Sequence, residues 1–347
     1  MYDIITIGSA TIDTFVETNA ANIVSVSSVN SKNDFMAYPY GSKIEIDKFE
    51  LATGGGAVNT AINFTNLGFK TSSIIKIGDE IQGQNILQVL KNKNVDTSNV
   101  IVSKEDKTGF SVILTSFQGD RTVLAHRGAN SNLKKSEINF EAIKNSKWLY
   151  IAPLNGESTK ILDEIATFAE RNDVNMAINI GTSSIKKGAN YLSKILETAE
   201  VVILNKEEAS MLTSIVVRPD SKGEKFSNEI IHPDIKSMLN KLKSTHAKIV
   251  IITDGKNGVY AFDGNSYYQC DQFPAKVVST LGAGDAFSST FVATLEKTSW
   301  DVKTSLIYAS VNAASVVENF GAHEGFLTFE QIKSKLKNYP DFSANIC

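Results

Sequence analysis

Residues 277–287, which read VVSTLGAGDAF, hold the residue types best suited to chemistry. Small and hydroxylated residues lead through Gly282, Ala283 and Gly284 into Asp285, and an apolar run with helical spacing follows. Backbone N–H groups that open a helix bind anions, and glycines let that backbone approach a phosphate closely. A carboxylate there repels phosphate, so its economical role is to take a proton from an attacking hydroxyl group. The stretch therefore indicates phosphoryl transfer, with Asp285 as the base.

The same stretch also has a structural interpretation. It fits a glycine turn before a buried helix, with Asp285 favoured in the first turn by the helix dipole. Gly282 and Gly284 imitate a dinucleotide-binding fingerprint, but Phe287 stands where its third glycine belongs. The chain contains no Walker-type phosphate loop. At a helix start Asp285 is expected to keep a low pKa, which a loose phosphoryl-transfer transition state tolerates.

A second glycine cluster at residues 54–56 precedes another helical pattern and puts Asn59 in its first turn. An amide side chain donates and accepts hydrogen bonds, which suits sugar hydroxyls, although a flexible turn with a solvated Asn59 is the alternative. Asp13 follows the first expected strand, at the end where α/β sheets bind ligands, but a loop or N-cap aspartate looks the same. Arg127 ends a β-rich segment and either meets a phosphate or substrate or is solvated.

Two further motifs follow later strands. Asn205 and Glu208 have the spacing of a capping box, and the functional alternative places Glu208 near a magnesium ion held by phosphate oxygens and water. Thr253, Gly255 and Gly258 form a hairpin turn by composition. The glycines of that turn also suit the border of a nucleotide phosphate or ribose.

The elements that position these motifs alternate between strand and helix. Apolar runs predict strands at 2–7, 71–77, 148–152, 175–180, 201–204 and 248–253. Helical spacing predicts helices at 57–67, 82–92, 158–171, 206–212, 233–244, 285–297, 302–318 and 329–337. The Ile, Val and Leu content of the strands indicates burial on both faces. The alternation predicts an α/β fold, a doubly wound and mostly parallel sheet flanked by helices.

Two segments, about 12–52 and 97–127, look instead like antiparallel strands without helices, and the second carries a hairpin signal around residues 118–121. They are expected to form a small sheet over the edge of one domain that spans 1–347. That sheet is either a lid that excludes water or a structural, dimer-forming sheet. Residues 214–234 are expected to be a surface insertion, and 338–347 a poorly ordered or loosely docked tail.

Composition excludes several classes of protein. The chain has 347 residues, 42% hydrophobic and 21% charged, as in a globular protein with an ample core. A net charge of −3 suggests neither a nucleic-acid surface nor a polybasic membrane patch. Two cysteines and four scattered histidines favour a reducing cytoplasm and argue against a zinc site. No apolar run approaches the roughly 20 residues that span a bilayer.

The order and spacing of these motifs closely resemble the PfkB/ribokinase family of carbohydrate and nucleoside kinases. The resemblance spans about residues 2–337 and rests on Gly8-Ser9…Asp13, Gly54-Gly55…Asn59, Asn205-x-x-Glu208, Thr253-x-Gly255…Gly258 and Gly282–Asp285. It implies a ribokinase-like fold and an ATP-dependent kinase that phosphorylates a hydroxymethyl group beneath a β lid. A small sugar or nucleoside is the expected partner, and a lid-to-lid homodimer is plausible by the same resemblance.

The resemblance also implies roles for single residues. Asp285 looks like the base, and the amides of residues 282–284 look like the anion hole. The remaining assignments are Asp13, Gly55 and Asn59 for the sugar, Asn205 and Glu208 for magnesium and phosphate, Thr253, Gly255 and Gly258 for the nucleotide-side turn, and Asn312 for the adenine pocket.

Departures from the family pattern limit what the resemblance implies. Ser279 replaces an Asp that helps hold a monovalent cation in ribokinase-like members, which puts potassium activation in doubt. Thr11 stands where ribokinases carry an Asn that contacts ribose, and Gly56 stands where they carry a Lys. Other sugars or a nucleoside therefore stay open as the acceptor. Two alternatives remain: a catalytically silent nucleotide-binding or regulatory protein on the same fold, which the intact motifs disfavour, and an oxidoreductase that binds a dinucleotide.

Overall fold

The computed structural model describes residues 1–28, 32–115, 121–218 and 231–347. Within these ranges the largest sheet has nine strands in the order β17-β16-β15-β14-β13-β12-β11-β1-β6. They are β1 (Tyr2–Ile7), β6 (Thr71–Ile74), β11 (Ser146–Ile151), β12 (Asn175–Asn179), β13 (Val201–Asn205), β14 (Ile249–Thr253), β15 (Val259–Phe262), β16 (Tyr267–Cys270) and β17 (Ala344–Ile346). Strands β6, β1 and β11 to β14 run parallel, and β15 to β17 continue the sheet antiparallel. The expected fold class is confirmed.

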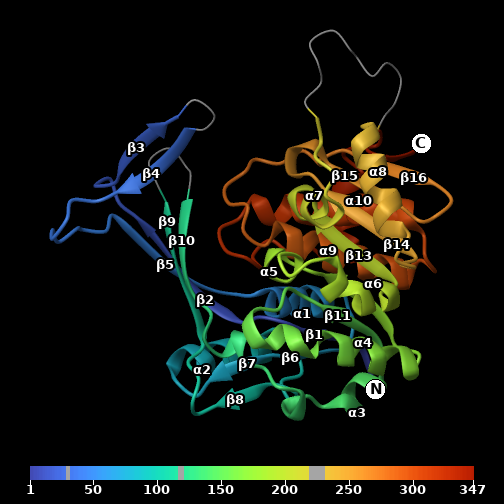
Figure 1. The fold of residues 1–347 in the computed structure, drawn as a ribbon, viewed down its shortest axis with the longest axis horizontal. Coiled ribbons are helices and arrows are strands. Elements are labelled where there is room, and N and C mark those ends of the chain that lie inside the picture. The colour runs from blue at the N-terminus through green and yellow to red at the C-terminus, as the bar shows by residue number, and fades with distance from the viewer. Residues whose placement is uncertain (29–31, 116–120, 219–230) are drawn as a thin grey trace, which may run out of the picture.

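Helices cover both faces of this sheet (Figure 1). They are α1 (Gly56–Asn66), α2 (Ile81–Asn92), α3 (Phe140–Lys144), α4 (Leu162–Arg171), α5 (Thr182–Ile185), α6 (Ser193–Thr198), α7 (Lys206–Thr213), α8 (Pro233–Lys243), α9 (Ala283–Lys297), α10 (Val302–Val317) and α11 (Phe329–Leu336). The expected helix at 158–171 divides into the 3₁₀ helix η3 (Gly156–Ile161) and α4, and the expected strand at 71–77 divides into β6 and β7 (Lys76–Gly78). The short helices α3, α5 and α6 were not expected, because they are too brief to show a helical period.

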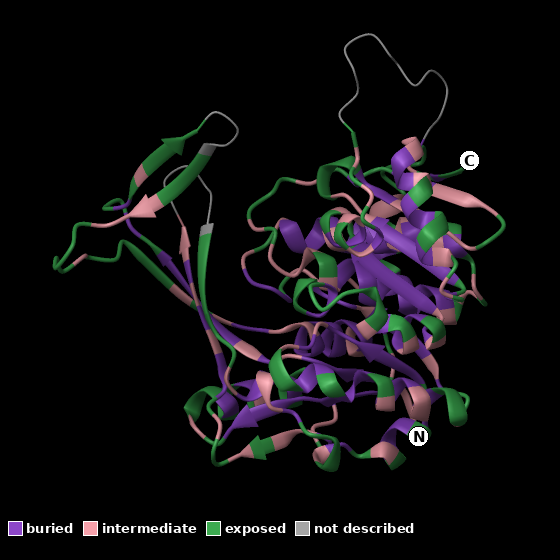
Figure 2. Cartoon of the chain, viewed as in Figure 1, coloured by how far each residue is buried: buried purple, intermediate pink, exposed green. Residues whose placement is uncertain are grey.

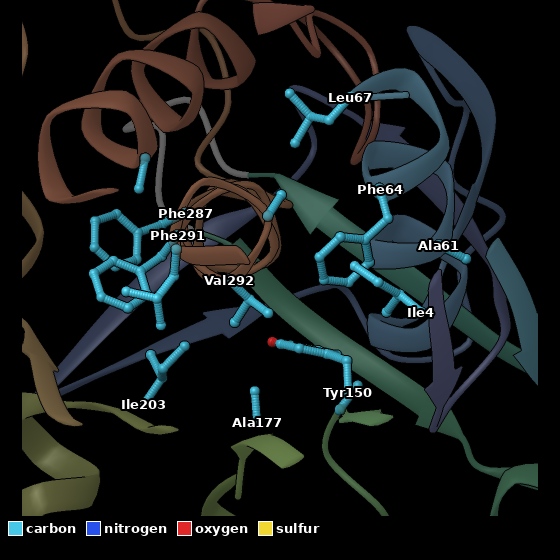
Figure 3. Packing of buried hydrophobic residues seen from close by; sticks show 14 of the residues in the cluster. Ile4, Ala61, Phe64, Leu67, Tyr150, Ala177, Ile203, Phe287, Phe291 and Val292 are labelled. Atoms are coloured by element: carbon cyan, nitrogen blue, oxygen red, sulfur yellow. The ribbon is translucent and has the colours of Figure 1, made fainter. Parts of the chain in front are cut away.

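Side chains alternate between the two faces of β11 and join two separate hydrophobic clusters. Trp148 and Tyr150 belong to the cluster under α1, α9 and α10, whereas Leu149 and Ile151 belong to the cluster under α4, α6 and α8. Figure 2 shows this central layer as almost entirely buried. In Figure 3, Phe64 of α1 and Tyr150 point toward α9, and their ring centroids lie 5.6 Å apart. The first cluster therefore fixes α1 and α9, the two helices that follow the glycine motifs.

A smaller sheet projects from one edge of this body (Figure 1). Its described strands have the order β10-β9-β2-β5, with β2 at Thr11–Glu17, β5 at Lys48–Gly54, β9 at Gly109–Thr115 and β10 at Arg121–His126. The hairpin of β3 (Asn22–Ser27) and β4 (Lys32–Ala37) extends it outward. The small sheet was expected to be antiparallel, but β2 runs parallel to β9. Residues 118–120 of the expected hairpin turn lie outside the described ranges.

The expected boundaries of the small sheet are partly wrong. Strand β8 (Ile101–Ser103) lies within the segment 97–127, yet it pairs with β7 beside the main body and takes no part in the small sheet. The expected surface insertion at 214–234 is described only at its two ends, where the Arg218 guanidinium lies 3.0 Å from the Asp234 carboxylate. None of the helices in the described ranges is long and apolar enough to cross a membrane.

The segment 338–347 is not a loosely docked tail. Strand β17 pairs antiparallel with β16 and becomes the edge of the main sheet. The rings of Tyr339 and Phe342 lie 4.6 and 4.9 Å from the ring of Phe273, which is fully buried. Tyr339 is exposed and Phe342 is partly buried, and the contacts of both rings with the buried Phe273 offset part of the entropy lost on ordering the segment.

Candidate active site

The N-terminus of α9 forms the centre of the site. Gly282 caps the helix with φ +79°, and a Cβ atom there would lie 2.0 Å from the Ala322 carbonyl oxygen, so only glycine fits. At Gly284 a Cβ atom would meet nothing within 4 Å, so this backbone borders open space. The first N–H groups of a helix have no intrahelical acceptor. The geometry is therefore suited to an anion hole made of the amides of Gly282, Ala283 and Gly284.

The two glycine motifs meet at Asp285. Asn59 Nδ2 donates a 2.8 Å hydrogen bond to Asp285 Oδ2 across 226 residues of sequence. A Cβ atom on Gly56 would lie 3.6 Å from Asp285 Oδ1 and 2.8 Å from the Cβ atom of Ala152. Helices α1 and α9 thus place the amide of one motif against the carboxylate of the other.

Burial raises the pKa of Asp285 to about 6, opposed by the hydrogen bond from Asn59 and assisted by the negative charge of Asp13. The low pKa expected from the helix start is therefore wrong. The helix dipole favours the charged form, but the loss of hydration outweighs it.

Asp13 lies on β2 beside the same site. It pairs with Ala52 on β5 and Ser111 on β9, and the Ser111 hydroxyl donates a short hydrogen bond to Asp13 Oδ1. Burial raises the pKa of Asp13, opposed by the hydroxyl groups of Ser111 and Thr11. A Cβ atom on Gly54 would lie 2.2 Å from Asp13 Oδ2, so a side chain at this position would displace the Asp13 carboxylate.

A buried acceptor atom suits a polar ligand at this side of α9. Asn59 is only 3% exposed, and its Oδ1 atom has no hydrogen-bond partner among the described residues. An unsatisfied buried acceptor is costly and is readily explained by a ligand hydroxyl. Gly55 has φ +99°, and its Cα packs against the backbone of Ser9 and Ala10, which brings the glycine turn against the end of β1.

A cavity of about 600 Å³ opens on the other side of the α9 N-terminus. Its residues are Asn205, Glu207, Thr253, Asp254, Gly255, Lys256, Gly258, Val259, Asp271, Gln272, Phe273, Val277, Thr280, Ala283, Gly284, Phe287, Ser310, Ala313, Ala314 and Val317. The structure thus brings together Asn205, Thr253, Gly255 and Gly258, which the sequence singled out separately. The cavity has an apolar wall from α10 and a polar end at the glycines, as a nucleotide requires.

Asn205 and Glu208 make the capping box that the sequence offered as the structural interpretation. Asn205 Oδ1 accepts from Glu208 N at 2.8 Å, and Glu208 Oε2 accepts from Asn205 N at 3.1 Å. Glu208 Oε1 accepts from the Thr182 hydroxyl at 3.2 Å, and burial raises the pKa of Glu208. The described residues contain no cluster of three His, Cys, Asp or Glu that could hold a metal. Glu208 does not line the cavity, whereas its neighbour Glu207 does, so the magnesium role of Glu208 stays a prediction.

Asn312 does not line the cavity, so its expected place in the adenine pocket is wrong. It is fully buried; its Nδ2 donates to Thr290 and Asn63, and its Oδ1 accepts from Leu327 N at 2.9 Å. The face of α10 that lines the cavity carries Ser310, Ala313, Ala314 and Val317. Two residues along a helix turn a side chain by about 200°, which directs Asn312 into the core.

Arg127 is exposed just after β10, and the described contacts that join Asp13, Asn59 and Asp285 do not include it. Sequence reasoning missed Ser111 and Asn130. Asn130 Nδ2 donates to Ala10 O, and Ala10 N donates to Asn130 Oδ1, each at 2.8 Å, which fixes the junction between β1 and β2. Strand register places Ser111 beside Asp13, and Asn130 reaches Ala10 from a 3₁₀ helix 120 residues away, so neither partner can be read from local sequence. The helical spacing of Ser310, Ala313 and Val317, in contrast, could have indicated the cavity wall.

Comparisons with known proteins agree with this fold. The model of the pfkB family carbohydrate kinase matches residues 20–328. A 5-dehydro-2-deoxygluconokinase from Geobacillus thermodenitrificans is 28% identical over 84% of this chain and 86% of its own length. A ribokinase from Staphylococcus aureus is 25% identical, with 84% and 91% covered. The solved structure of Arabidopsis thaliana ribokinase with ribose and ATP is similar in fold, with a TM-score of 0.78, 20% identity and 97% and 99% of the two chains covered.

Proposed function

Because the chain belongs to the pfkB family of carbohydrate kinases, we propose that it transfers the γ-phosphoryl group of ATP to a hydroxymethyl group of a small sugar. One observation carries this proposal. The Asp285 carboxylate, bonded to Asn59, lies in the first turn of α9, and the neighbouring Gly284 backbone opens into the 600 Å³ cavity. An alcohol on the Asp285 side and a nucleotide in the cavity would meet at the same helix end.

In the proposed reaction Asp285 takes the proton of the acceptor hydroxyl as the oxygen–phosphorus bond forms. A pKa of about 6 keeps the carboxylate ionised at neutral pH and makes it a stronger base than an ordinary aspartate. The amides of residues 282–284 stabilise the negative charge of the transferring group, because the helix fixes them before the reaction. Proton removal and charge stabilisation thereby act from one rigid element.

Asp13, Asn59 and the backbone of Gly55 are the proposed acceptor site. Asp13 keeps its carboxylate buried beside Ser111, where it can accept hydrogen bonds from sugar hydroxyls. The free Oδ1 atom of Asn59 offers a second acceptor. Arg127 is proposed to contact the acceptor or a phosphate when the small sheet closes as a lid over the site.

Asn205, Thr253, Gly255 and Gly258 are proposed to hold the nucleotide, since all four line the cavity. A magnesium ion bound with ATP would neutralise phosphate charge, and Glu208 would orient its waters. Ser279 replaces the Asp that helps hold a monovalent cation in ribokinase-like members, so we propose that this protein turns over without potassium.

The outer part of the small sheet is proposed to pair with a second copy of the chain. Its exposed apolar residues are Val24, Val26, Phe35, Phe49, Leu51, Val123 and Leu124. Clustered apolar side chains on strands favour a protein interface. Light scattering in solution tests this, and a monomer at micromolar concentration would exclude it.

The proposed function is tested by ADP release from ATP and magnesium across neutral pentoses, hexoses, ketoses, deoxy-keto acids and nucleosides. The names of the relatives make a deoxy-keto acid and ribose the first acceptors to try. We expect one class to give turnover and Asp285→Asn to lower kcat by about 10²–10⁴-fold with unchanged ADP binding by calorimetry. An Asp285→Asn variant with near wild-type kcat would refute the assignment of Asp285 as the base. If no acceptor in the panel gives ADP release, the silent nucleotide-binding protein is favoured.

A further inference from the structure

The segment between α10 and α11, residues 318–328, contacts the α9 N-terminus; we call it the α10–α11 loop. Its Ala322 is 1% exposed, and the Ala322 carbonyl packs directly on Gly282, where a Cβ atom would lie 2.0 Å from the oxygen. The backbone of Gly282 cannot shift toward the loop without moving Ala322. The loop thus forms the support behind the first amides of α9.

The same loop is bonded to the small sheet. His323 Nε2 and the Thr53 hydroxyl on β5 form a 2.7 Å hydrogen bond across 270 residues of sequence. Both side chains are buried, at 9% and 8% exposure. The ring of Phe320 adds a second contact, 4.5 Å from the ring of Phe15 on β2. The loop therefore touches the small sheet at two strands.

Thr53 stands one residue before the glycine cluster that begins α1. The residues that follow Thr53 border the proposed acceptor site. Gly54 leaves room for the Asp13 carboxylate, and helix α1, which begins just after it, places Asn59 in hydrogen-bond contact with Asp285. His323 follows Ala322 directly in the loop that supports Gly282. The single Thr53–His323 bond consequently lies between the residues around the acceptor and those around the transferring phosphoryl group.

We propose that Thr53 and His323 form a positioning pair that holds the acceptor side of the site in register with the anion hole of α9. Neither residue touches the reacting atoms. The inference rests on the proposed function, since it assigns the pair to alignment within that reaction. A small misplacement of reacting groups costs far more rate than binding, because the transition state tolerates less displacement than the bound ground state.

Among the described residues, Thr53 is the one hydrogen-bond partner of the His323 ring. His323 Nδ1 makes no hydrogen bond, and the nearest carboxylate, Glu324 Oε1, is 3.5 Å away. Burial lowers the pKa of His323, so the ring is neutral at working pH and uses Nε2 for Thr53 alone. Loss of the Thr53 hydroxyl leaves the ring without its one polar anchor.

The test compares Thr53→Val, which keeps the side-chain shape, with Thr53→Ser, which keeps the hydroxyl. Ser73→Ala is the matched control, because it removes a buried 2.9 Å hydroxyl bond to Thr6 within the main sheet. We expect Thr53→Val to lower kcat at least tenfold while the KM for both substrates and the Kd for ADP change less than twofold. Thr53→Ser should recover most of kcat, and Ser73→Ala should lose Tm without losing kcat.

Hydrogen exchange gives a readout that does not need turnover. Thr53→Val should speed amide exchange at residues 280–287 and 319–326, whereas Ser73→Ala should leave both segments unchanged. A kcat within twofold of the control, no recovery in Thr53→Ser, or unchanged exchange at 280–287 would each overturn the pair. Failure of the proposed function is distinguishable, because it leaves the wild-type protein without ADP release from any acceptor.

Discussion

Among single residues, Asp285 carries the proposed reaction, which depends on the protonation of its carboxylate. Its carboxylate accepts from Asn59 but lies where burial raises the pKa to about 6. This raised pKa should affect activity and stability in opposite directions. The proposed reaction needs the charged carboxylate, so activity should rise with pH, whereas burial disfavours the charged form, so the contribution of Asp285 to stability should fall.

The pH profile of kcat/KM should report this carboxylate. Activity needs the ionised form, so kcat/KM should fall as pH drops through about 6, well above the range of an ordinary aspartate. Asn59→Ala should move this fall to higher pH, because the lost hydrogen bond stabilised the charged form. A profile measured between pH 4.5 and 9 checks both; a midpoint near 4 in the wild-type protein would contradict the raised pKa.

Asp285→Asn should stabilise the protein at neutral pH. The folded pKa lies above the unfolded value, so the native state binds the proton more tightly. Its contribution is present below the unfolded pKa near 3.8 and is lost as pH rises through about 6. The variant removes this cost, and we expect a gain on the order of 1–3 kcal/mol at pH 7.5 that vanishes near pH 3.5. Urea unfolding at both pH values measures this gain. Asp263→Asn is the control: the pKa of the Asp263 carboxyl group is lowered in the folded protein, so this substitution should destabilise the protein at neutral pH.

At the element scale, the first turn of α9 depends on two glycines for different reasons. Gly282 has φ +79° and no room beside Ala322, whereas Gly284 borders the open cavity. The first is required by the fold and the second by space for a ligand, although the sequence shows them as equivalent members of one motif.

Gly282→Ala and Gly284→Ala should therefore fail differently. The first should destabilise the protein by about 1–3 kcal/mol and lower kcat, because a strained cap displaces the helix start. The second should keep Tm but weaken ADP binding several-fold, since the new methyl group enters the cavity. Differential scanning calorimetry and ADP titration separate them; equal losses of Tm would contradict this division.

Across the whole molecule, the C-terminal segment packs behind one wall of the cavity that we propose for the nucleotide. Phe273 lines the cavity and is held by the rings of Tyr339 and Phe342, while β17 completes the sheet edge. The contact joins the last residues of the chain to the proposed active site around Asp285.

Phe342→Ala should raise the KM for ATP and lower Tm, with little change in the KM for the acceptor, because the cavity left behind Phe273 loosens only the nucleotide wall. Initial rates with each substrate varied in turn provide the measurement. Phe35→Ala on the small sheet is the control, since Phe35 is 54% exposed and lies far along the chain from this wall. A larger effect on acceptor KM than on ATP KM would refute this role.

The strand–helix alternation and the motifs that act through backbone groups could be predicted from the sequence. The glycines at 54–56, 282 and 284 indicate a close approach of the backbone, because the missing side chain is itself the signal. The capping box of Asn205 and Glu208 could also be predicted, because its two partners lie only three residues apart in the sequence. Local spacing is enough when both partners of an interaction belong to one turn.

Which side chains lie together could not be predicted before the chain was seen folded. The phase of α10 turned Asn312 into the core, strand register put Ser111 on Asp13, and burial reversed the expected pKa of Asp285. The bond between Thr53 and His323 joins residues that no local pattern connects. Desolvation and packing depend on everything that surrounds a group in space, so the chain must fold before either has a value.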